Sequence, residues 1–181
     1  MNSYSMKKPA IFIDRDGTLV EEVNYLHRVE DMLIFPFTGP ALRLLRDNGY
    51  RTIVVTNQSG IGRGVYTEAD MQSVHDAMRS DLEGLIDAFY FCPHLPDAGC
   101  RCRKPGLGMI ESARGDFDID MDRSWVIGDK DLDVKLGHQA GIRSVMVMTG
   151  HGKNHKPFLE FDPDFFAPDL GAAAAMIIEN M

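Results

Sequence analysis

The feature that most constrains this chain is a series of short apolar runs, each of which ends at a polar residue or a glycine. They occupy residues 10–13, 52–55, 88–91, 125–127 and 145–148. Runs this short, apolar on both faces and often β-branched, are typical of strands buried inside a parallel sheet. The sequence therefore predicts five buried parallel strands.

Helical patterns separate these runs. One apolar face stops at Asn48 and Gly49, and Thr67 with Asp70 resembles a capping box at the start of a second helix. Further helices are expected at residues 109–113, 132–140 and 170–179, the last with Ala172, Met176 and Ile177 on its inner face. Strands that alternate with helices form βαβ units, which predicts an α/β fold with a parallel sheet covered by helices on both faces.

The composition fits one globular domain over residues 1–181, because 44% of the residues are hydrophobic, 25% are charged and no linker interrupts the chain. Residues 1–9 lack an apolar core, and every apolar run is far shorter than the roughly 18 residues of a membrane helix. We therefore expect a cytoplasmic protein without signal peptide or membrane segment. The net charge of −8 disfavours binding to nucleic acid. We expect a monomer, because no long exposed apolar helix requires a protein partner.

Three of the apolar runs are followed by residues that can bind a metal or a phosphate. Asp14, Thr56 and Asp129 are far apart in the sequence, but the carboxyl ends of parallel strands share one edge of the sheet. Asp14 and Asp16, followed by the flexible Gly17, form a carboxylate pair suited to Mg²⁺, and Asp129 can complete its ligand shell. The alternative for each segment taken alone is an ordinary polar turn.

Two further segments add groups that bind anions. The Thr56 hydroxyl and the backbone N–H groups after it can receive phosphoryl oxygens. Lys104 supplies a point charge for a transferring phosphoryl group, while Arg103 can grip a second anion bidentately. Asp133 is expected either to cap the helix after Asp129 or to orient Lys130.

In this order and spacing, the segments 14–18, 56–59, 103–105 and 128–133 resemble the haloacid dehalogenase superfamily of phosphotransferases. The resemblance implies a Rossmann-like, doubly wound sheet and an aspartyl-phosphate mechanism. Asp14 would be the nucleophile and Asp16 the general acid and base. Thr56 and Lys104 would hold the phosphoryl oxygens, and Mg²⁺ would lie on Asp14, Asp129 and the Asp16 carbonyl. The short spacing between segments leaves no room for a large cap domain.

A loop over residues 92–102 contains all three cysteines of the chain and one histidine. Cys92, His94, Cys100 and Cys102 form a set suited to tetrahedral Zn²⁺, and four protein ligands leave no open position, so the predicted zinc is structural. The alternatives are free thiols or an Fe–S cluster. Because the loop runs directly into Arg103, zinc would also fix the anion-binding side chains.

A cysteine–histidine loop before Arg103 and Lys104 narrows the resemblance to the subfamily of heptose bisphosphate and histidinol-phosphate phosphatases, and residues 59–61 favour the heptose branch. The implied substrate is a small phosphorylated sugar. Its implied contacts are Glu22, Val23, Asn24, Tyr25, Asn57, Gln58, Ser59, Arg103 and Lys130. The alternatives are a histidinol-phosphate phosphatase, a nucleic-acid 3′-phosphatase and a zinc-stabilised binding protein without catalysis.

The remaining histidines are not predicted to be ligands. His75 lies on a predicted helix, which favours a core or surface role, and His151 and His155 lie in a polar loop without a partner at metal spacing. His27 follows the implied substrate stretch, where contact with the ligand is a minor alternative.

Overall fold

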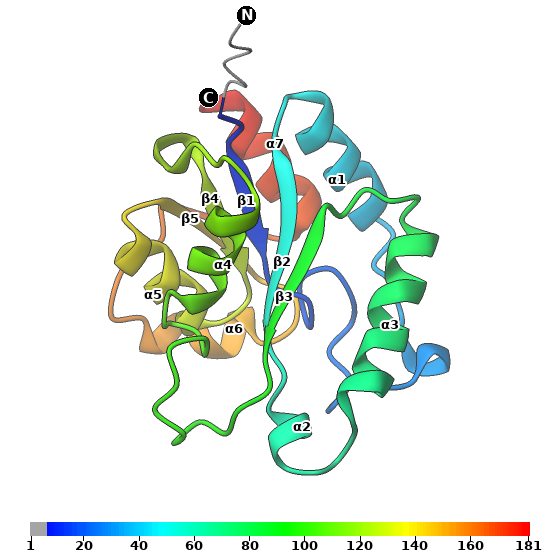
Figure 1. The fold of residues 1–181 in the computed structure, drawn as a ribbon. Helices are drawn as coiled ribbons and strands as arrows, with labels where there is room; N and C mark the ends of the chain where they lie inside the picture. Colours follow the sequence, from blue (N-terminus) through cyan, green and yellow to red (C-terminus); the bar gives the residue numbers. More distant parts are fainter. Residues whose placement is uncertain (1–6) are drawn as a thin grey trace, which may run out of the picture.

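The computed structural model describes residues 7–181, which form a six-stranded parallel sheet in the order β3-β2-β1-β4-β5-β6 (Figure 1). The strands are β1 (Ala10–Ile13), β2 (Arg51–Asn57), β3 (Ala88–Cys92), β4 (Trp125–Gly128), β5 (Arg143–Val147) and β6 (Phe165–Ala167). The first five confirm the predicted runs. The sixth, which pairs with β5 from Phe165 at Val145, was not predicted because three apolar residues show no periodicity.

The helices confirm the predicted positions and add short ones. They are α1 (Thr38–Asp47), α2 (Ser59–Gly62), α3 (Glu68–Asp81), α4 (Gly108–Asp116), α5 (Asp131–Ala140), α6 (Gly152–His155) and α7 (Leu170–Glu179), with 3-10 turns at Val29–Asp31, Met121–Arg123 and Lys156–Phe158. The capping box of Thr67 and Asp70 is present at the start of α3. The short helices were missed because a single turn is too brief to display a helical face.

The inner face of α7 agrees in part with the predicted one, because Ile177 is buried and Ala172 and Met176 pack at the margin of the core. Ala173, Ala174 and Ile177 are buried, whereas Ala172 and Met176 are only partly covered. Helix α7 packs along α1, and small alanine side chains let two helix backbones approach closely. The choice of face therefore follows from the neighbouring helix, which the sequence of α7 does not reveal.

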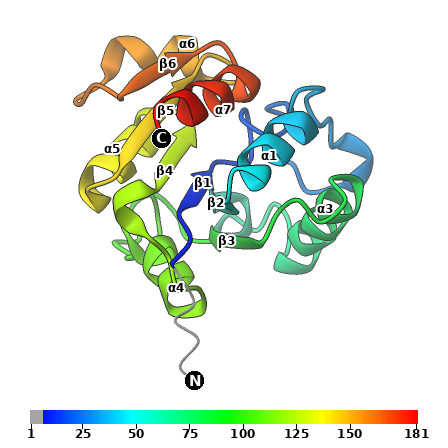
Figure 2. The ribbon, with the colours of Figure 1, turned by 90° about the horizontal axis from the view of Figure 1, so that it is seen from above.

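Helices cover both faces of the sheet, as predicted (Figure 2). Helices α1, α3 and α7 pack on one face over a core that includes Ile11, Val54 and Trp125. Helices α4 and α5 cover the other face, where the core includes Phe12 and Val126. Successive residues of one strand thus enter opposite cores, which explains why the runs are apolar without alternation.

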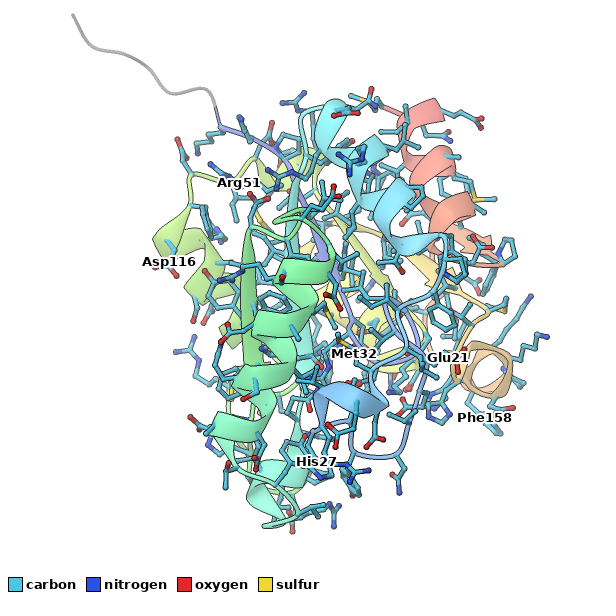
Figure 3. The ribbon with its side chains drawn as sticks, turned by 90° about the vertical axis from the view of Figure 1, so that its right-hand side faces the viewer. Glu21, His27, Met32, Arg51, Asp116 and Phe158 are labelled. Atoms are coloured by element: carbon cyan, nitrogen blue, oxygen red, sulfur yellow. The ribbon has the colours of Figure 1, made fainter. Side chains whose placement is uncertain are left out.

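The carboxyl ends of the strands form one edge of the molecule, and the described residues begin and end at the opposite edge (Figure 1). In Figure 3, His27 lies at the first edge and Arg51, which begins β2, at the other. The described residues between β1 and β2 form loops and a helix, and those between β2 and Lys104 form loops, helices and strand β3, with no cap domain in either segment. The expected absence of a cap is confirmed, and the edge stays open to solvent.

None of the helices within residues 7–181 has both the length and the apolar character needed to cross a membrane. The expectation of no signal peptide rests in part on residues 1–6, which lie outside the described residues.

Candidate active site

Asp14 stands at the centre of the strand-end edge, directly after β1. Its backbone N–H donates to the Ile127 carbonyl (2.9 Å), so β4 holds it in place, and its side chain is buried. Gly17 then turns the chain with φ of 81°, in the left-handed region where glycine carries no steric penalty. A Cβ at Gly17 would also collide with the Asp129 carboxylate, so both the backbone conformation and the lack of space require glycine here.

Lys104 is brought to Asp14 from the far end of the cysteine–histidine loop. Lys104 is only 4% exposed. Its ammonium lies 2.8 Å from Asp14 Oδ1 and 2.7 Å from Asp133 Oδ1, and it donates to the Val55 carbonyl (2.9 Å). Burial would lower the pKa of Lys104, but the two carboxylates outweigh burial and raise it. Lys104 therefore stays charged, and its charge in turn holds the pKa of Asp14 below the usual value despite burial.

Asp133 settles an alternative that the sequence left open. Its Oδ2 accepts from the Lys130 backbone N–H (3.1 Å) at the start of α5, and its Oδ1 accepts from the Lys104 ammonium. Asp133 therefore caps α5, which was one of the two predicted roles. Its other contact is with the Lys104 ammonium and not with the side chain of Lys130. A partner 29 residues away could not be read from local spacing.

Asp129 carries the clearest signature of a cation-binding site. Its Oδ2 accepts from the His151 N–H (2.7 Å), but its buried Oδ1 has no hydrogen-bond partner. Burial, reinforced by the negative charge of Asp14, raises the pKa of Asp129 to about 8. Carboxylate oxygens of Asp14, Asp129 and Asp133 lie within 4.8 Å of one another. The unpartnered carboxylate oxygen of Asp129, close to the Asp14 carboxylate, fits a hard divalent cation such as Mg²⁺ bound by these two residues.

A polar hollow of about 190 Å³ opens beside this centre. Seven of the predicted substrate contacts line it: Glu22, Asn24, Tyr25, Asn57, Gln58, Ser59 and Lys130. A narrower cleft of about 30 Å³ continues inward between Asp14, Thr56 and Lys104. The structure thus brings the predicted phosphate and sugar contacts to adjoining spaces, one narrow and one wide.

Two predicted contacts lie outside the hollow. The Val23 side chain packs against the core under the loop, so its apolar surface is turned away from the polar space. Arg103 is half-buried and donates to the His94 carbonyl (3.4 Å) on the cysteine–histidine loop.

Sequence reasoning missed three residues that line the hollow, Leu26, Tyr66 and His151. The Tyr66 ring fills the space over Gly60, where a Cβ would collide with it, and it stacks on His27 with ring centroids 5.3 Å apart. His151 Nε2 lies 3.4 Å from Glu22 Oε2. His151 follows the fifth strand as Asp14 follows the first, so the strand-end argument could have found it, whereas no local signal marks Tyr66.

The four predicted zinc ligands gather at the end of β3. The Cys102 sulfur lies 3.1 Å from that of Cys92 and 3.6 Å from that of Cys100, and 3.2 Å from His94 Nδ1. A tetrahedron with Zn–S bonds of about 2.3 Å has ligand separations of about 3.8 Å. Burial raises the pKa of the Cys92 thiol to about 12, so without a metal this thiol stays protonated. The described cluster therefore fits a tetrahedral metal ion that displaces thiol protons.

Backbone contacts tie this loop to the site. The Gln58 N–H donates to the Cys92 carbonyl (2.8 Å), and Asn57 exchanges hydrogen bonds with the Lys104 backbone (3.0 and 3.3 Å). The loop therefore sets where Lys104 enters the site.

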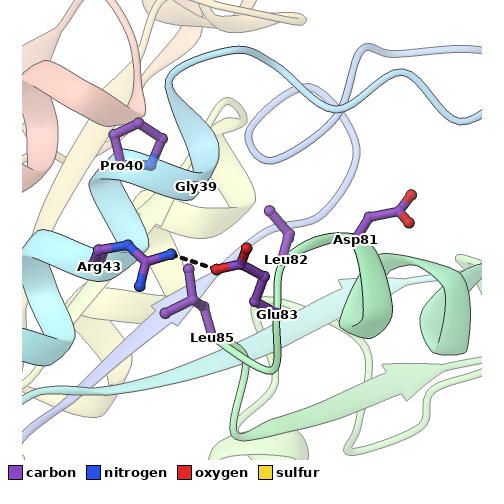
Figure 4. A pocket seen from close by; sticks show the side chains of 7 residues that line it. All are labelled: Gly39, Pro40, Arg43, Asp81, Leu82, Glu83 and Leu85. Atoms are coloured by element: carbon purple, nitrogen blue, oxygen red, sulfur yellow. Dashed lines mark hydrogen bonds and ion pairs between the residues drawn. The ribbon is translucent and has the colours of Figure 1, made fainter.

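A larger hollow, of about 410 Å³, lies between α1 and the end of α3 (Figure 4). The ion pair of Arg43 and Glu83 spans it, and Leu82 and Leu85 line its wall. It shares no residue with the strand-end site and holds no carboxylate pair near a buried cation.

Comparison with known proteins places the chain among the phosphatases that its motifs resemble. Residues 101–173 match the HAD-hydrolase-like family. The D-glycero-D-manno-heptose-1,7-bisphosphate 7-phosphatase of Thermosynechococcus vestitus is 36% identical over 97% of this chain and 98% of its own length. The chain belongs to this heptose-bisphosphate phosphatase family. The D-glycero-alpha-D-manno-heptose-1,7-bisphosphate 7-phosphatase of Photorhabdus laumondii, a further family member, is 44% identical over 77% of this chain and 82% of its own length.

A solved heptose-bisphosphate phosphatase shares the fold closely. The crystal structure of the D,D-heptose 1,7-bisphosphate phosphatase from B. bronchiseptica, complexed with magnesium and phosphate, superposes with a TM-score of 0.87 at 29% identity. The match covers 96% of this chain and 99% of that one. The Rossmann-like fold and the family resemblance are thereby confirmed, and the chain is a phosphoric monoester hydrolase of the haloacid dehalogenase superfamily.

Proposed function

We propose that this enzyme removes the 7-phosphate of D-glycero-D-manno-heptose 1,7-bisphosphate with the help of Mg²⁺. The observation that carries the proposal is the buried Asp14, paired with Lys104 (2.8 Å) and next to the unpartnered oxygen of Asp129. A carboxylate can approach a phosphate dianion only where cations compensate both charges. The adjoining polar hollow and the named relatives support a phosphorylated heptose as the substrate.

The transfer step uses Asp14 as the nucleophile. A carboxylate oxygen of Asp14 forms a bond to phosphorus while the bond from phosphorus to the sugar oxygen breaks on the opposite side. Lys104 and the Thr56 hydroxyl hold the phosphoryl oxygens at the floor of the narrow cleft. Asp14, Asp129 and the Asp16 carbonyl would hold Mg²⁺, which when bound neutralises negative charge on the phosphoryl group.

Asp16 moves the proton. It lines both the narrow cleft and the hollow, which suits a group between the phosphoryl and the sugar. Its carboxyl group donates a proton to the departing sugar oxygen, and its carboxylate then takes a proton from the water that attacks the phosphorus of the aspartyl phosphate. Inorganic phosphate leaves and the Asp14 carboxylate is restored.

The cysteine–histidine cluster holds a structural Zn²⁺ in this proposal. Three thiolates and one imidazole complete a tetrahedral shell, so the ion takes no part in hydrolysis. The hydrogen bonds from Gln58 and Asn57 to this loop mean that zinc fixes Lys104 and Arg103 indirectly.

The test is phosphate release from the heptose 1,7-bisphosphate and from histidinol phosphate, each with Mg²⁺ and with EDTA. We expect rapid Mg²⁺-dependent cleavage of the heptose alone, with one phosphate released per sugar. Preference for histidinol phosphate would keep the mechanism but overturn the substrate. Inertness towards both, with Mg²⁺ shown to bind, would overturn the proposed function.

Replacing Arg103 by Ala will raise the KM for the bisphosphate by about tenfold, as expected for a lost charge-assisted contact to the retained phosphate. The KM for a sugar monophosphate of similar size will rise less. Steady-state kinetics on both substrates provides the measurement, with Arg101→Ala as a control, because Arg101 pairs with Glu111 on the surface. Equal increases for the two substrates would deny Arg103 the second-phosphate role.

The affinity for Mg²⁺ will depend on pH through Asp129. Its pKa is raised to about 8 in the metal-free fold, so below that pH a proton must leave before the metal binds. Between about pH 4 and about pH 8 the metal-free folded state keeps a proton on Asp129 that the unfolded state has released. The free energy of unfolding of the metal-free protein therefore falls as the pH rises through this range. The apparent dissociation constant for Mg²⁺ will be about 50-fold larger at pH 6 than at pH 8, because about half of the Asp129 side chains are deprotonated at pH 8 but only about 1% at pH 6. Calorimetric titration at both values tests this, and Asp129→Asn should abolish the pH dependence.

A further inference from the structure

Arg15 lies between the two catalytic carboxylates in the sequence, yet its side chain does not line the phosphate cleft. The guanidinium is 0% exposed and approaches the neighbouring Asp16 side-on, with Nε 3.2 and 3.1 Å from the two carboxylate oxygens and Nη2 3.0 Å from Oδ1. The same Nη2 also lies 3.2 Å from the Leu26 carbonyl and 3.0 Å from Gln58 Oε1, and Nη1 lies 3.2 Å from His75 Nε2. Each nitrogen of the guanidinium thus contacts a protein group.

We propose that Arg15, Gln58 and Tyr66 form a buried positioning network that holds the Asp16 carboxylate in the orientation for proton transfer. The inference rests on the acid and base role proposed for Asp16. It changes the role of Gln58 from a substrate contact to a positioning residue, and it gives Arg15 and Tyr66 a function in the reaction although neither is expected to touch the phosphoryl group.

The hydrogen bonds of Gln58 support this role. Its Oε1 accepts from Arg15 and from the Tyr66 hydroxyl, while its Nε2 donates to Asp16 Oδ2 (2.9 Å) and Thr56 Oγ1 (2.8 Å). Arginine can only donate and an ionised carboxylate can only accept, so these partners fix which end of the amide faces which way. All four bonds of the amide are used inside the protein, which leaves none for a sugar hydroxyl.

The far side of the network is closed by His75 on α3. The His75 ring is buried and stacks on Phe89 with ring centroids 4.4 Å apart. Burial, with the nearby Arg15 charge, lowers the pKa of His75 to about 3, so the ring is neutral and Nε2 can accept from the guanidinium. A neutral acceptor on that side leaves Asp16 as the carboxylate that pairs with Arg15.

Fold stability alone does not explain such an arrangement. A buried ion pair contributes little to stability, because removing the charges from water costs about as much as their attraction returns. Its advantage here is geometric. The site has no cap, so a lone carboxylate at an open edge would sample several rotamers, whereas a planar fork and an amide hold it in one.

The leaving group provides the test. Phenyl phosphate has a poor leaving group and needs a well-placed general acid, whereas p-nitrophenyl phosphate hardly needs one. Arg15→Lys keeps the charge but loses the fork. The ratio kcat/KM reports the step that expels the leaving group, whereas kcat can also contain the hydrolysis of the aspartyl phosphate that both substrates share. With Arg15→Lys, kcat/KM for phenyl phosphate should fall about 30-fold and kcat/KM for p-nitrophenyl phosphate about threefold or less. The matched control is Arg46→Lys, because Arg46 pairs with Asp87 (2.8 Å) away from the site.

Equal losses on the two aryl phosphates, or a response no different from that of Arg46→Lys, would overturn the proposal. Should Arg15→Lys fail to fold by circular dichroism, Tyr66→Phe removes only one hydroxyl and should show the same selectivity for the poor leaving group, at about threefold. No selectivity in Tyr66→Phe would then count against the network. Neither aryl phosphate contains a sugar, so the contrast remains measurable even if the wild-type enzyme does not cleave the heptose bisphosphate.

Discussion

Asp14→Asn should reduce phosphate release by at least about 10³-fold, because an amide cannot attack phosphorus as a carboxylate does. The change is nearly isosteric, and the backbone bond from Asp14 to Ile127 does not involve the side chain, so the fold should persist. Lys104 keeps Asp133 as a partner (2.7 Å), which spares it from becoming an unpaired buried charge. Single-turnover phosphate release with Mg²⁺ measures the loss.

A trapped phosphoryl group identifies the intermediate independently of the rate, and an oxygen label shows that water attacks phosphorus and not the Asp14 carbonyl carbon. If the wild-type enzyme turns over once in water enriched in heavy oxygen, the label goes to inorganic phosphate, because water attacks the phosphorus of the aspartyl phosphate. A trapped phosphoryl group should map to the peptide that contains Asp14 by mass spectrometry. Asp120→Asn is the matched control, since Asp120 pairs with Arg123 on the surface. Normal turnover by Asp14→Asn would contradict the covalent mechanism.

Three residues of the site that the sequence predicted to meet share one property: each lies at the carboxyl end of a recognisable strand. Asp14, Thr56 and Asp129 could be placed at one edge because parallel strands end together, and the edge then dictates their proximity. The cysteine–histidine loop was predictable for a different reason, since ligand types at short spacing specify a metal geometry directly.

The parts that it did not predict depend on side chains that meet across the fold. Arg15 and His75 are separated by 60 residues, and Lys104 and Asp133 by 29. Neither pair leaves a periodic or local signal, because each forms only after the helices have packed on the sheet. Val23 was predicted to contact the substrate but packs against the core. Which side chains of residues 22–25 line the hollow depends on the conformation of their loop, which no local pattern reveals.

The cysteine–histidine cluster should contribute more to stability than any other single feature of the loop region. Cys102 lies close to each of the other three ligands, 3.1 Å from the Cys92 sulfur, 3.6 Å from the Cys100 sulfur and 3.2 Å from His94 Nδ1. A serine oxygen at this position is a poor zinc ligand, and metal binding free energy is folding free energy for the segment that it closes. Cys102→Ser should therefore lower the Tm by about 10 °C or more.

The same substitution should lower kcat, although no atom of Cys102 lines the hollow or the narrow cleft. Lys104 follows two residues later and is held by Asn57, so a loosened loop displaces the ammonium from Asp14. His94→Gln should act in the same direction, whereas His138→Gln, an exposed histidine on α5 that stacks on Phe161, should change neither Tm nor kcat. Zinc content by atomic absorption, Tm and kcat should fall together across the first two variants. A Cys102→Ser protein that lacks zinc but keeps full stability and turnover would show that the cluster does not support the site. Lys104 would then owe its position to its bonds with Asp14, Asp133, Asn57 and the Val55 carbonyl.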